Sequence, residues 1–396
     1  MVKEIVIAGG KRTPFGDFGK SLKDIPLSSL ATHAAQASIE NAGIKSADID
    51  HLVWGNVLPV DPDGYYIGRV AALNIGMPES SCALQVNRAC GSGTQAIITA
   101  AQQILTGHGK IALAGGGENF SRGGFVNQKM RWGVIRGSQA FEDSVEWAYN
   151  DPFGNGLMGV TAENLADDYQ YQRDQMDEWS LMSQQRAGAA IESGFLAKQI
   201  SPIEVPEGRK NTRLMEHDEF PRPDVSIEKL GMLRPVFRKD GKVTPGNSSG
   251  VTDGAAFVVV GDRDSLEKKG SEPLARLVDW AIVGVAPRIM GCGPVPAIQA
   301  LWEKRGLKAS DIDYYEINEA FAVVNLHAEK ELGVSREVTN SYGGGISIGH
   351  PPGATGVRMT LTAIHHLIDT NQRYAVISMC MGGGQGMAVL IENLKK

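Results

Sequence analysis

Residues 44–50 read Ile-Lys-Ser-Ala-Asp-Ile-Asp, and residues 307–313 read Leu-Lys-Ala-Ser-Asp-Ile-Asp. The second stretch lies 263 positions after the first (307 minus 44). Because further matches keep the same shift, the sequence predicts a duplicated structural unit. The further pairs are Gly91-Ser92-Gly93 with Ala354-Thr355-Gly356, and residues 110–114 with residues 373–377.

Each copy has the pattern of an α/β unit. Apolar runs follow the two Asp-Ile-Asp turns, at residues 52–54 and 314–317, and predict a strand in each copy. After Gly93, apolar residues recur at helical spacing up to Leu105, and their broad apolar face indicates a helix buried between layers. Short apolar runs typical of central strands follow at residues 111–114 and 376–379.

Between the copies lies a region of different composition, near residues 120–248. It is rich in Trp and Pro, and its clearest helix is predicted from an N-cap at Asp174 to Ser193. We expect this region to be either a lid or oligomer contact, or a plain covering subdomain. The predicted domains are 1–119 plus 249–270 as the first half, 120–248 as an inserted loop domain, and 271–396 as the second half.

The composition limits the possible functions. The chain has 396 residues and a net charge of −6, so no overall charge attracts nucleic acid or an anionic membrane. The first residues read as a strand and not as a signal peptide, and no apolar run has the roughly 20 residues needed to cross a bilayer. The four cysteines lack CxxC spacing. We therefore expect a cytoplasmic protein with no zinc or other bound metal and no cofactor.

Three short stretches place reactive side chains among glycines. Cys90 lies in Asn-Arg-Ala-Cys-Gly-Ser-Gly, His350 in Gly-His-Pro-Pro-Gly, and Cys380 in Cys-Met-Gly-Gly-Gly-Gln-Gly. Together they predict a thiol nucleophile, its base and a second acid/base. Because Cys90 directly precedes a predicted helix, we expect the helix N-terminus to favour its thiolate. The remaining cysteines, Cys82 and Cys292, are expected to be buried structural residues.

These stretches resemble the active-site loops of the thiolase family, together with Asn318-Glu319-Ala320-Phe321. The resemblance extends over the whole chain and keeps the order of the family's motifs. It implies an α/β thiolase fold, with two similar halves in a five-layered α/β/α/β/α arrangement and an inserted loop domain. The other resembling stretches are residues 158–164, 246–255 and 290–297.

The resemblance also implies an acyltransferase that joins an acyl-CoA to acetyl-CoA, or cleaves 3-ketoacyl-CoA with CoA. Cys90 would carry the acyl group, His350 would take its proton, and Cys380 would move the proton on carbon. His350 and a water held by Asn318 would form one oxyanion hole, and the N–H groups of Cys90 and Gly382 the other.

Coenzyme A thioesters are thus expected as substrates, with acetyl-CoA, acyl-CoA and CoA as partners and no nucleic acid or membrane. Family-like positions are Arg222 near the adenine, Phe237 along the pantetheine and Ser249 as its hydrogen-bond partner. The family forms dimers, often paired into tetramers, which implies a homodimer or homotetramer here. Met158, Met290 and Phe321 are further candidates for substrate contacts.

Some positions depart from the family pattern and leave the chain length of the substrate open. Leu157 stands where many acetoacetyl-CoA thiolases have His, Lys229 where Ser is common, and Pro352 and Thr355 where Ile and Ser are usual. Two alternatives remain: a decarboxylative ketoacyl-synthase-like enzyme, which would lack a cysteine such as Cys380, and a silent acyl-CoA-binding or lipid-binding member of the superfamily.

Overall fold

The computed structural model describes residues 3–208 and 210–395. Its main sheet runs in the order β14-β15-β16-β13-β1-β12-β5-β3-β4, and β2 (Gly16–Asp17) pairs with β12. The two halves meet where β1 pairs with β13, through Val6–Arg276 and Ile7–Ala275. The first half contains β1 (Ile5–Arg12), β3 (His51–Gly55), β4 (Cys82–Val86), β5 (Ile111–Glu118) and β12 (Thr252–Asp262). The second contains β13 (Ala275–Gly284), β14 (Tyr314–Ile317), β15 (Tyr374–Met381) and β16 (Gln385–Asn393).

The predicted duplication is confirmed by equivalent hydrogen bonds at the predicted shift. In the first half, Asp50 Oδ2 accepts the backbone N–H groups of residues 110 and 111, at 2.7 and 3.2 Å. In the second half, Asp313 Oδ2 accepts those of residues 373 and 374, at 2.9 and 2.8 Å. Each aspartate thus ties the start of one strand to the start of its parallel neighbour. Both follow a short 3₁₀ turn, Ser46–Asp48 in the first copy and Ala309–Asp311 in the second.

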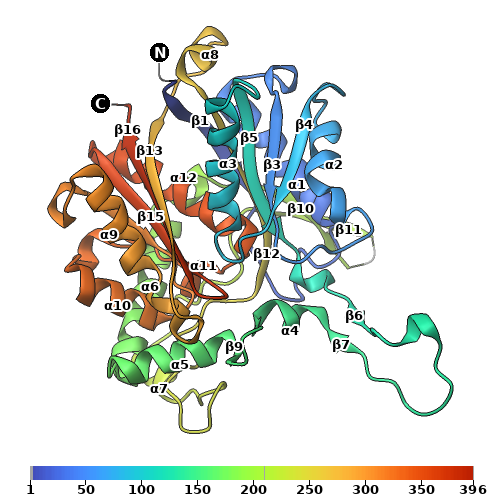
Figure 1. Cartoon of the computed structure of the whole chain (residues 1–396), viewed down its shortest axis with the longest axis vertical. Helices are drawn as coiled ribbons and strands as arrows, with labels where there is room; N and C mark the ends of the chain where they lie inside the picture. Colours follow the sequence, from blue (N-terminus) through green and yellow to red (C-terminus); the bar gives the residue numbers. More distant parts are fainter. Residues whose placement is uncertain (1–2, 209, 396) are drawn as a thin grey trace.

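Helices cover both halves and fill the space between them, so the five-layered fold is confirmed (Figure 1). One outer layer holds α1 (Leu27–Ala42) and α2 (Ile67–Asn74). The other holds α9 (Pro294–Arg305) and α10 (Ala322–Leu332). The middle layer is the pair α3 (Ser92–Leu105) and α12 (Pro352–Thr370), which are the two helices that follow the cysteine and histidine loops.

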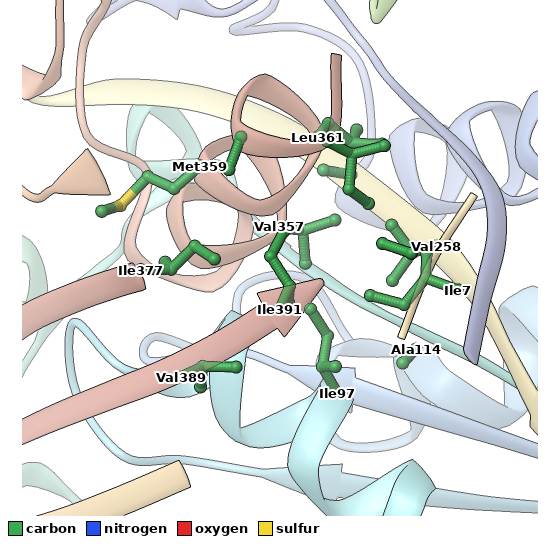
Figure 2. Close-up of a cluster of buried hydrophobic side chains, with 14 of the residues drawn as sticks. Ile7, Ile97, Ala114, Val258, Val357, Met359, Leu361, Ile377, Val389 and Ile391 are labelled. Atoms are coloured by element: carbon green, nitrogen blue, oxygen red, sulfur yellow. The ribbon is translucent and has the colours of Figure 1, made fainter. Parts of the chain in front are cut away.

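The middle helices are buried in a shared apolar core. Figure 2 shows Ile97 of α3 and Val357 and Leu361 of α12 among strand residues of both halves, such as Val258 and Ile391. Burial of such apolar surface supplies most of the free energy that holds the layers together. The two helices touch at their N-terminal turns, because a methyl group on Gly93 would lie 2.4 Å from the Gly353 carbonyl oxygen. The loops before these turns are therefore fixed next to each other.

The region between the halves combines four helices with short hairpins and carries one long arm. The helix predicted from Asp174 is α6 (Arg173–Glu192), and its N-cap is Gln172, which corrects the predicted cap. The arm (residues 123–143) extends away from the body in Figure 1.

The predicted domain boundaries stay a prediction. Other elements here are β6 (Phe125–Val126), β7 (Glu142–Asp143), α4 (Ser144–Tyr149), β8 (Asn150–Asp151), β9 (Gly156–Leu157), α5 (Met158–Asp168), β10 (Ile203–Glu207), β11 (Asn211–Met215) and α7 (Ile227–Gly231).

Two short helices complete the fold, α8 (Arg263–Lys268) after β12 and α11 (Gly345–Ile348) before the histidine loop. Within residues 3–208 and 210–395, no helix is both long and apolar enough to span a bilayer. In the same residues, no cluster of three or more His, Cys, Asp or Glu side chains could hold a metal ion.

Candidate active site

Cys90 lies on a constrained turn between β4 and the first residue of α3. The preceding residue, Ala89, has φ 46°, a left-handed conformation that is uncommon for any residue but glycine. The Ser92 hydroxyl fixes this turn, since it accepts the Arg88 N–H at 2.9 Å and donates to the Ala89 carbonyl at 2.7 Å. The Cys90 side chain is half-buried and lines a cavity of about 230 Å³.

His350 lines the same cavity, and its hydrogen bonds define its tautomer. Thr355 Oγ1 donates to the Pro351 carbonyl at 2.9 Å, so it can only accept from His350 Nδ1, at 2.7 Å. Nδ1 therefore carries the proton, and Nε2 is left unprotonated. The Asn318 amide, which contacts Nε2 at 3.3 Å, donates to it in this arrangement. The imidazole is thus held ready to accept a proton at Nε2.

Burial determines the resting charge of this pair. It lowers the pKa of His350 to about 3, and the positive charge of Arg358 acts in the same direction. Burial also raises the pKa of Cys90 to about 11, although the backbone N–H groups of Gly382 and Cys90 itself oppose this rise. The amides act in the direction that we predicted, but burial outweighs them. With these pKa values the resting pair is a neutral thiol and a neutral imidazole, because the amides lower the pKa of Cys90 less than burial raises it.

Cys380 is the penultimate residue of β15 and lies below the surface of the cavity. Its side chain is fully buried, and burial together with the charges of Cys90 and Cys292 raises its pKa well above the usual range. The glycines that follow form a sharp turn, with φ 81° at Gly383 and 83° at Gly384. This turn brings the Gly382 N–H to the sulfur of Cys90 and places Gly382 on the cavity wall.

Asn318 follows β14 directly and is held by its own backbone N–H, which donates to the Ser378 carbonyl at 2.9 Å. Its side chain is buried, and Oδ1 has no hydrogen-bond partner among the described residues. Asn318 and Cys380 are not among the residues that line the cavity, although Asn318 contacts His350, which does line it. A buried amide oxygen of this kind favours binding of a small hydrogen-bond donor such as water.

The other predicted contacts fall into two places. Met158, Met290, Phe321 and Ser249 line the cavity at Cys90. Phe237 lines an adjoining cavity of about 540 Å³, which shares Tyr149, Met158, Ser249 and Phe321 with the first. Arg222 is separate: it lines a third cavity, of about 350 Å³, together with Lys229. It contacts the adjoining cavity only through Asp17, at 3.3 Å.

The structure adds residues that the sequence did not single out. Glu118 is fully buried at the end of β5 and accepts the N–H groups of Val57, at 2.6 Å, and Leu58, at 3.2 Å. It directly follows three glycines, the same frame that marked the other loops, and this signal could have found it. Tyr149, Phe120 and Val57 line the cavity but carry no such motif.

The two remaining cysteines differ from the expectation that both are buried. Cys82 is exposed at the start of β4, and Cys292 is half-buried beside the core cluster that contains Cys380. An edge strand leaves one row of side chains and backbone groups in solvent, which accounts for the exposure of Cys82.

Comparison with known proteins supports the resemblance over the entire chain. The family described as "Thiolase, N-terminal domain" matches residues 5–264, and "Thiolase, C-terminal domain" matches residues 271–393. The beta-ketothiolase BktB of Cupriavidus necator is 45% identical over 395 residues, covering 100% of both chains. The beta-ketoadipyl-CoA thiolase of Pseudomonas aeruginosa is 41% identical and also covers 100% of both.

A solved structure agrees with this assignment. The crystal structure of human mitochondrial 3-ketoacyl-CoA thiolase has a TM-score of 0.96 and 39% identity, covering 99% of each chain. That protein has also been solved in complex with CoA. With both halves matched and the fold shared from end to end, the chain belongs to the thiolase family of acyltransferases.

Proposed function

We propose that the protein catalyses reversible Claisen condensation of an acyl-CoA with acetyl-CoA, and thiolytic cleavage of 3-ketoacyl-CoA, through an acyl-enzyme on Cys90. The observation that carries this proposal is the meeting of Cys90, His350 and Gly382 on the wall of one cavity, with the buried Cys380 close enough for the charge of Cys90 to raise its pKa. The relatives named as thiolases support the reaction class. No bound cofactor takes part in this proposal, because the thioesters are themselves the substrates.

In the first half-reaction of condensation, the Cys90 sulfur bonds to the thioester carbonyl carbon while His350 Nε2 takes the thiol proton. The bond to the CoA sulfur then breaks, and CoA leaves with that proton. Because both groups are neutral at rest, the thiolate forms only as the proton moves to Nε2. The N–H groups of Cys90 and Gly382 face the reacting sulfur and are placed to meet the carbonyl oxygen as it gains charge. Loss of one such donor typically raises the barrier by about 3–4 kcal/mol.

In the second half-reaction, Cys380 moves the proton on carbon. In the condensation direction it removes a proton from the acetyl group of acetyl-CoA, and the resulting carbon bonds to the acyl carbon as the bond to the Cys90 sulfur breaks. In cleavage Cys380 returns a proton to the leaving carbon. The raised pKa of Cys380 keeps it protonated at rest, which suits the donor role in cleavage. The enolate oxygen is stabilised by a water held at Asn318 Oδ1, the buried oxygen with no protein partner in the described residues, and by His350 when Nε2 carries a proton.

Coenzyme A is proposed to approach through the adjoining cavity. Phe237 and Ser249 line its wall, and Arg222 and Lys229 lie beyond the Asp17 contact as positive groups for phosphate. The solved CoA complex of the human relative supports binding of a CoA thioester by this fold.

We further propose that the protein is a homodimer or homotetramer. Two features support this: the arm exposes Trp132 (87% exposed) and Ile135 (99% exposed), and edge strand β4 leaves Leu84 in solvent. Exposed apolar groups gathered in one segment are typical of a protein–protein contact.

The function is tested by CoA-dependent loss of the Mg²⁺-enolate absorbance of acetoacetyl-CoA, repeated with longer 3-ketoacyl-CoA substrates. We expect CoA-dependent cleavage, and we expect Cys90→Ser to abolish both turnover and covalent labelling by a thioester. Absence of cleavage with every chain length would contradict the proposed reaction. Labelling that persists in Cys90→Ser would show that another group is the nucleophile.

A further inference from the structure

The two cavities that lead to Cys90 differ from the rest of the surface in charge. No lysine or arginine lines either of them among the described residues. The ionisable carboxylates on their walls, Asp17, Asp143 and Glu146, are all in the adjoining cavity. Asp17 is paired with Lys20 at 2.7 Å and with Arg222 at 3.3 Å, which leaves Asp143 and Glu146 as carboxylates of the adjoining cavity with no ion pair among the described residues. The Cys90 cavity, proposed for the acyl chain, is lined by neither a cation nor a carboxylate in the described residues.

Two buried carboxyl groups, Glu118 and Asp253, lie close to the Cys90 cavity. Burial raises the pKa of Glu118 to about 8, so it is mostly protonated at neutral pH, whereas Asp253, with a pKa of about 6, is mostly ionised and adds to the negative bias. Glu118 accepts from the amide of Asn56 at 2.8 Å and from backbone N–H groups, and Asp253 accepts from Ser121. Neither forms an ion pair with any described residue.

The buried or half-buried arginines near the catalytic loops are occupied elsewhere. Arg88 donates to Gln95 at 2.7 Å and to Gln385 at 3.0 Å. Arg358 is paired with Glu316 at 2.7 Å, with both side chains almost fully buried. His350 does line the cavity, but its pKa of about 3 keeps it neutral at physiological pH. Neither arginine lines either of the two cavities, so neither can form an ion pair with a group on the substrate chain there.

The walls of the Cys90 cavity suit an apolar chain. Val57, Phe120, Ala148 and Pro152 contribute apolar surface, and the polar contributions nearby come from Tyr149 and Asn150. The cavity volume of about 230 Å³ is far above the ~30 Å³ that one water molecule occupies. It therefore has room for more than the methyl end of an acetyl group.

We propose that this enzyme selects 3-ketoacyl-CoA thioesters whose acyl chain is uncharged and rejects chains that end in a carboxylate. The inference rests on the proposed function and narrows its substrate. It separates this chain from the substrate named for one relative at 41% identity, a beta-ketoadipyl-CoA thiolase, since an adipyl chain ends in a carboxyl group. Transfer of an unpaired carboxylate from water into such a site costs several kcal/mol, and like charges nearby add to this cost.

The test compares two substrates of equal chain length, 3-oxohexanoyl-CoA and 3-oxoadipyl-CoA, which differ in a terminal methyl against a terminal carboxylate. We expect kcat/KM for thiolysis to favour the methyl-ended chain by about 100-fold, which is about 2.8 kcal/mol at 1.4 kcal/mol per factor of ten. A preference below tenfold, or a preference for 3-oxoadipyl-CoA, overturns the inference.

Acetoacetyl-CoA distinguishes failure of this inference from failure of the proposed function. If the enzyme cleaves acetoacetyl-CoA but neither six-carbon substrate, the proposed function stands. The proposed selection of longer uncharged chains is then overturned. Inactivity with all three substrates would contradict the function itself, and the inference would fall with it.

A charge introduced on the wall gives a second test. Ala148 is half-buried on α4 and lines the cavity, so Ala148→Arg would supply the missing cation, while Ala148→Met adds comparable length without charge. We expect the Arg variant to reduce the preference for the methyl-ended chain at least tenfold relative to the Met variant. If the two variants show the same preference, the charge of the cavity does not select the substrate.

Discussion

At the scale of single residues, Thr355 decides how the histidine works. Its hydroxyl is committed to the Pro351 carbonyl as a donor, so it accepts from Nδ1 and leaves Nε2 to take the Cys90 proton. Thr355→Val removes this acceptor and leaves a buried N–H unpaired, a loss of about 1–3 kcal/mol. We expect kcat for thiolysis to fall roughly 10- to 100-fold, with KM for CoA nearly unchanged, while Thr355→Ser retains activity. Equal activity of the Val and Ser variants would show that the tautomer is set by another group.

The resting state of Cys90 gives a prediction in pH. Because burial raises the pKa of Cys90 to about 11, only a small fraction is thiolate at neutral pH, and that fraction grows as pH rises. Alkylation of Cys90 by iodoacetamide, followed by peptide mass spectrometry, should still accelerate between pH 8 and pH 10. The exposed Cys82 provides an internal comparison in the same digest. A rate at Cys90 that levels off near pH 7 would contradict the neutral resting thiol.

At the scale of elements, Glu118 links strand β5 to the loop that follows β3. Glu118 accepts the N–H groups of Val57 and Leu58 on different oxygens, so above its pKa of about 8, where both oxygens are acceptors, a glutamine in its place would turn an amide N–H toward at least one donor. Since Val57 lines the cavity, we expect Glu118→Gln to lower kcat about tenfold or more above pH 8, as the wall shifts. Asp313→Asn is the control, because Asp313 also accepts two backbone N–H groups, but at the start of its strand. The Asp313→Asn variant should show a lower melting temperature with unchanged kcat. If Glu118→Gln and Asp313→Asn lose kcat equally, the role of Glu118 is structural.

Glu118 also makes stability depend on pH. Burial raises its pKa to about 8, above the ordinary glutamate value of 4.5, so the folded protein holds this proton more tightly than the unfolded chain does. The resulting stabilisation is complete below pH 4.5 and is lost as pH rises through about 8. The melting temperature of the wild type should therefore fall relative to that of Glu118→Gln between pH 6 and pH 9. A constant difference across this range would contradict the raised pKa.

The sequence predicted elements well where local pattern and duplication agreed. The Asp-Ile-Asp turns, the strands after them and the two middle helices followed from a repeat that preserves both spacing and hydrogen-bonding residues. What it could not predict are properties that arise from packing between distant segments. The resting charge of Cys90 depends on burial by both halves, and the wall formed by Tyr149 and Phe120 depends on how the inserted region folds back. The N-cap of α6 was displaced by two residues, because Gln172 and Gln175 form the capping interaction that was expected of Asp174.

At the scale of the whole molecule, the duplicated halves place the active site where their middle helices begin. The cysteine loop enters from the first half, while the histidine loop, Asn318 and Cys380 come from the second. This arrangement needs both halves in fixed register, which the continuous sheet and the contact of Gly93 with Gly353 provide. The arm is absent from these contacts, so its apolar residues serve no purpose within the described part of one protomer.

The arm is therefore the place to test assembly. Trp132 and Ile135 are almost fully exposed, and covering such side chains gains roughly 1.5–3 kcal/mol each. We expect light scattering coupled to size-exclusion chromatography to give the mass of a tetramer for the wild type, and of a dimer for Trp132→Ser combined with Ile135→Ser. A matched variant, Leu105→Ser, removes an exposed apolar residue on α3 outside the arm and should leave the mass unchanged. A wild type that is monomeric, or a double variant that keeps the wild-type mass, would show that the arm does not join copies of this chain.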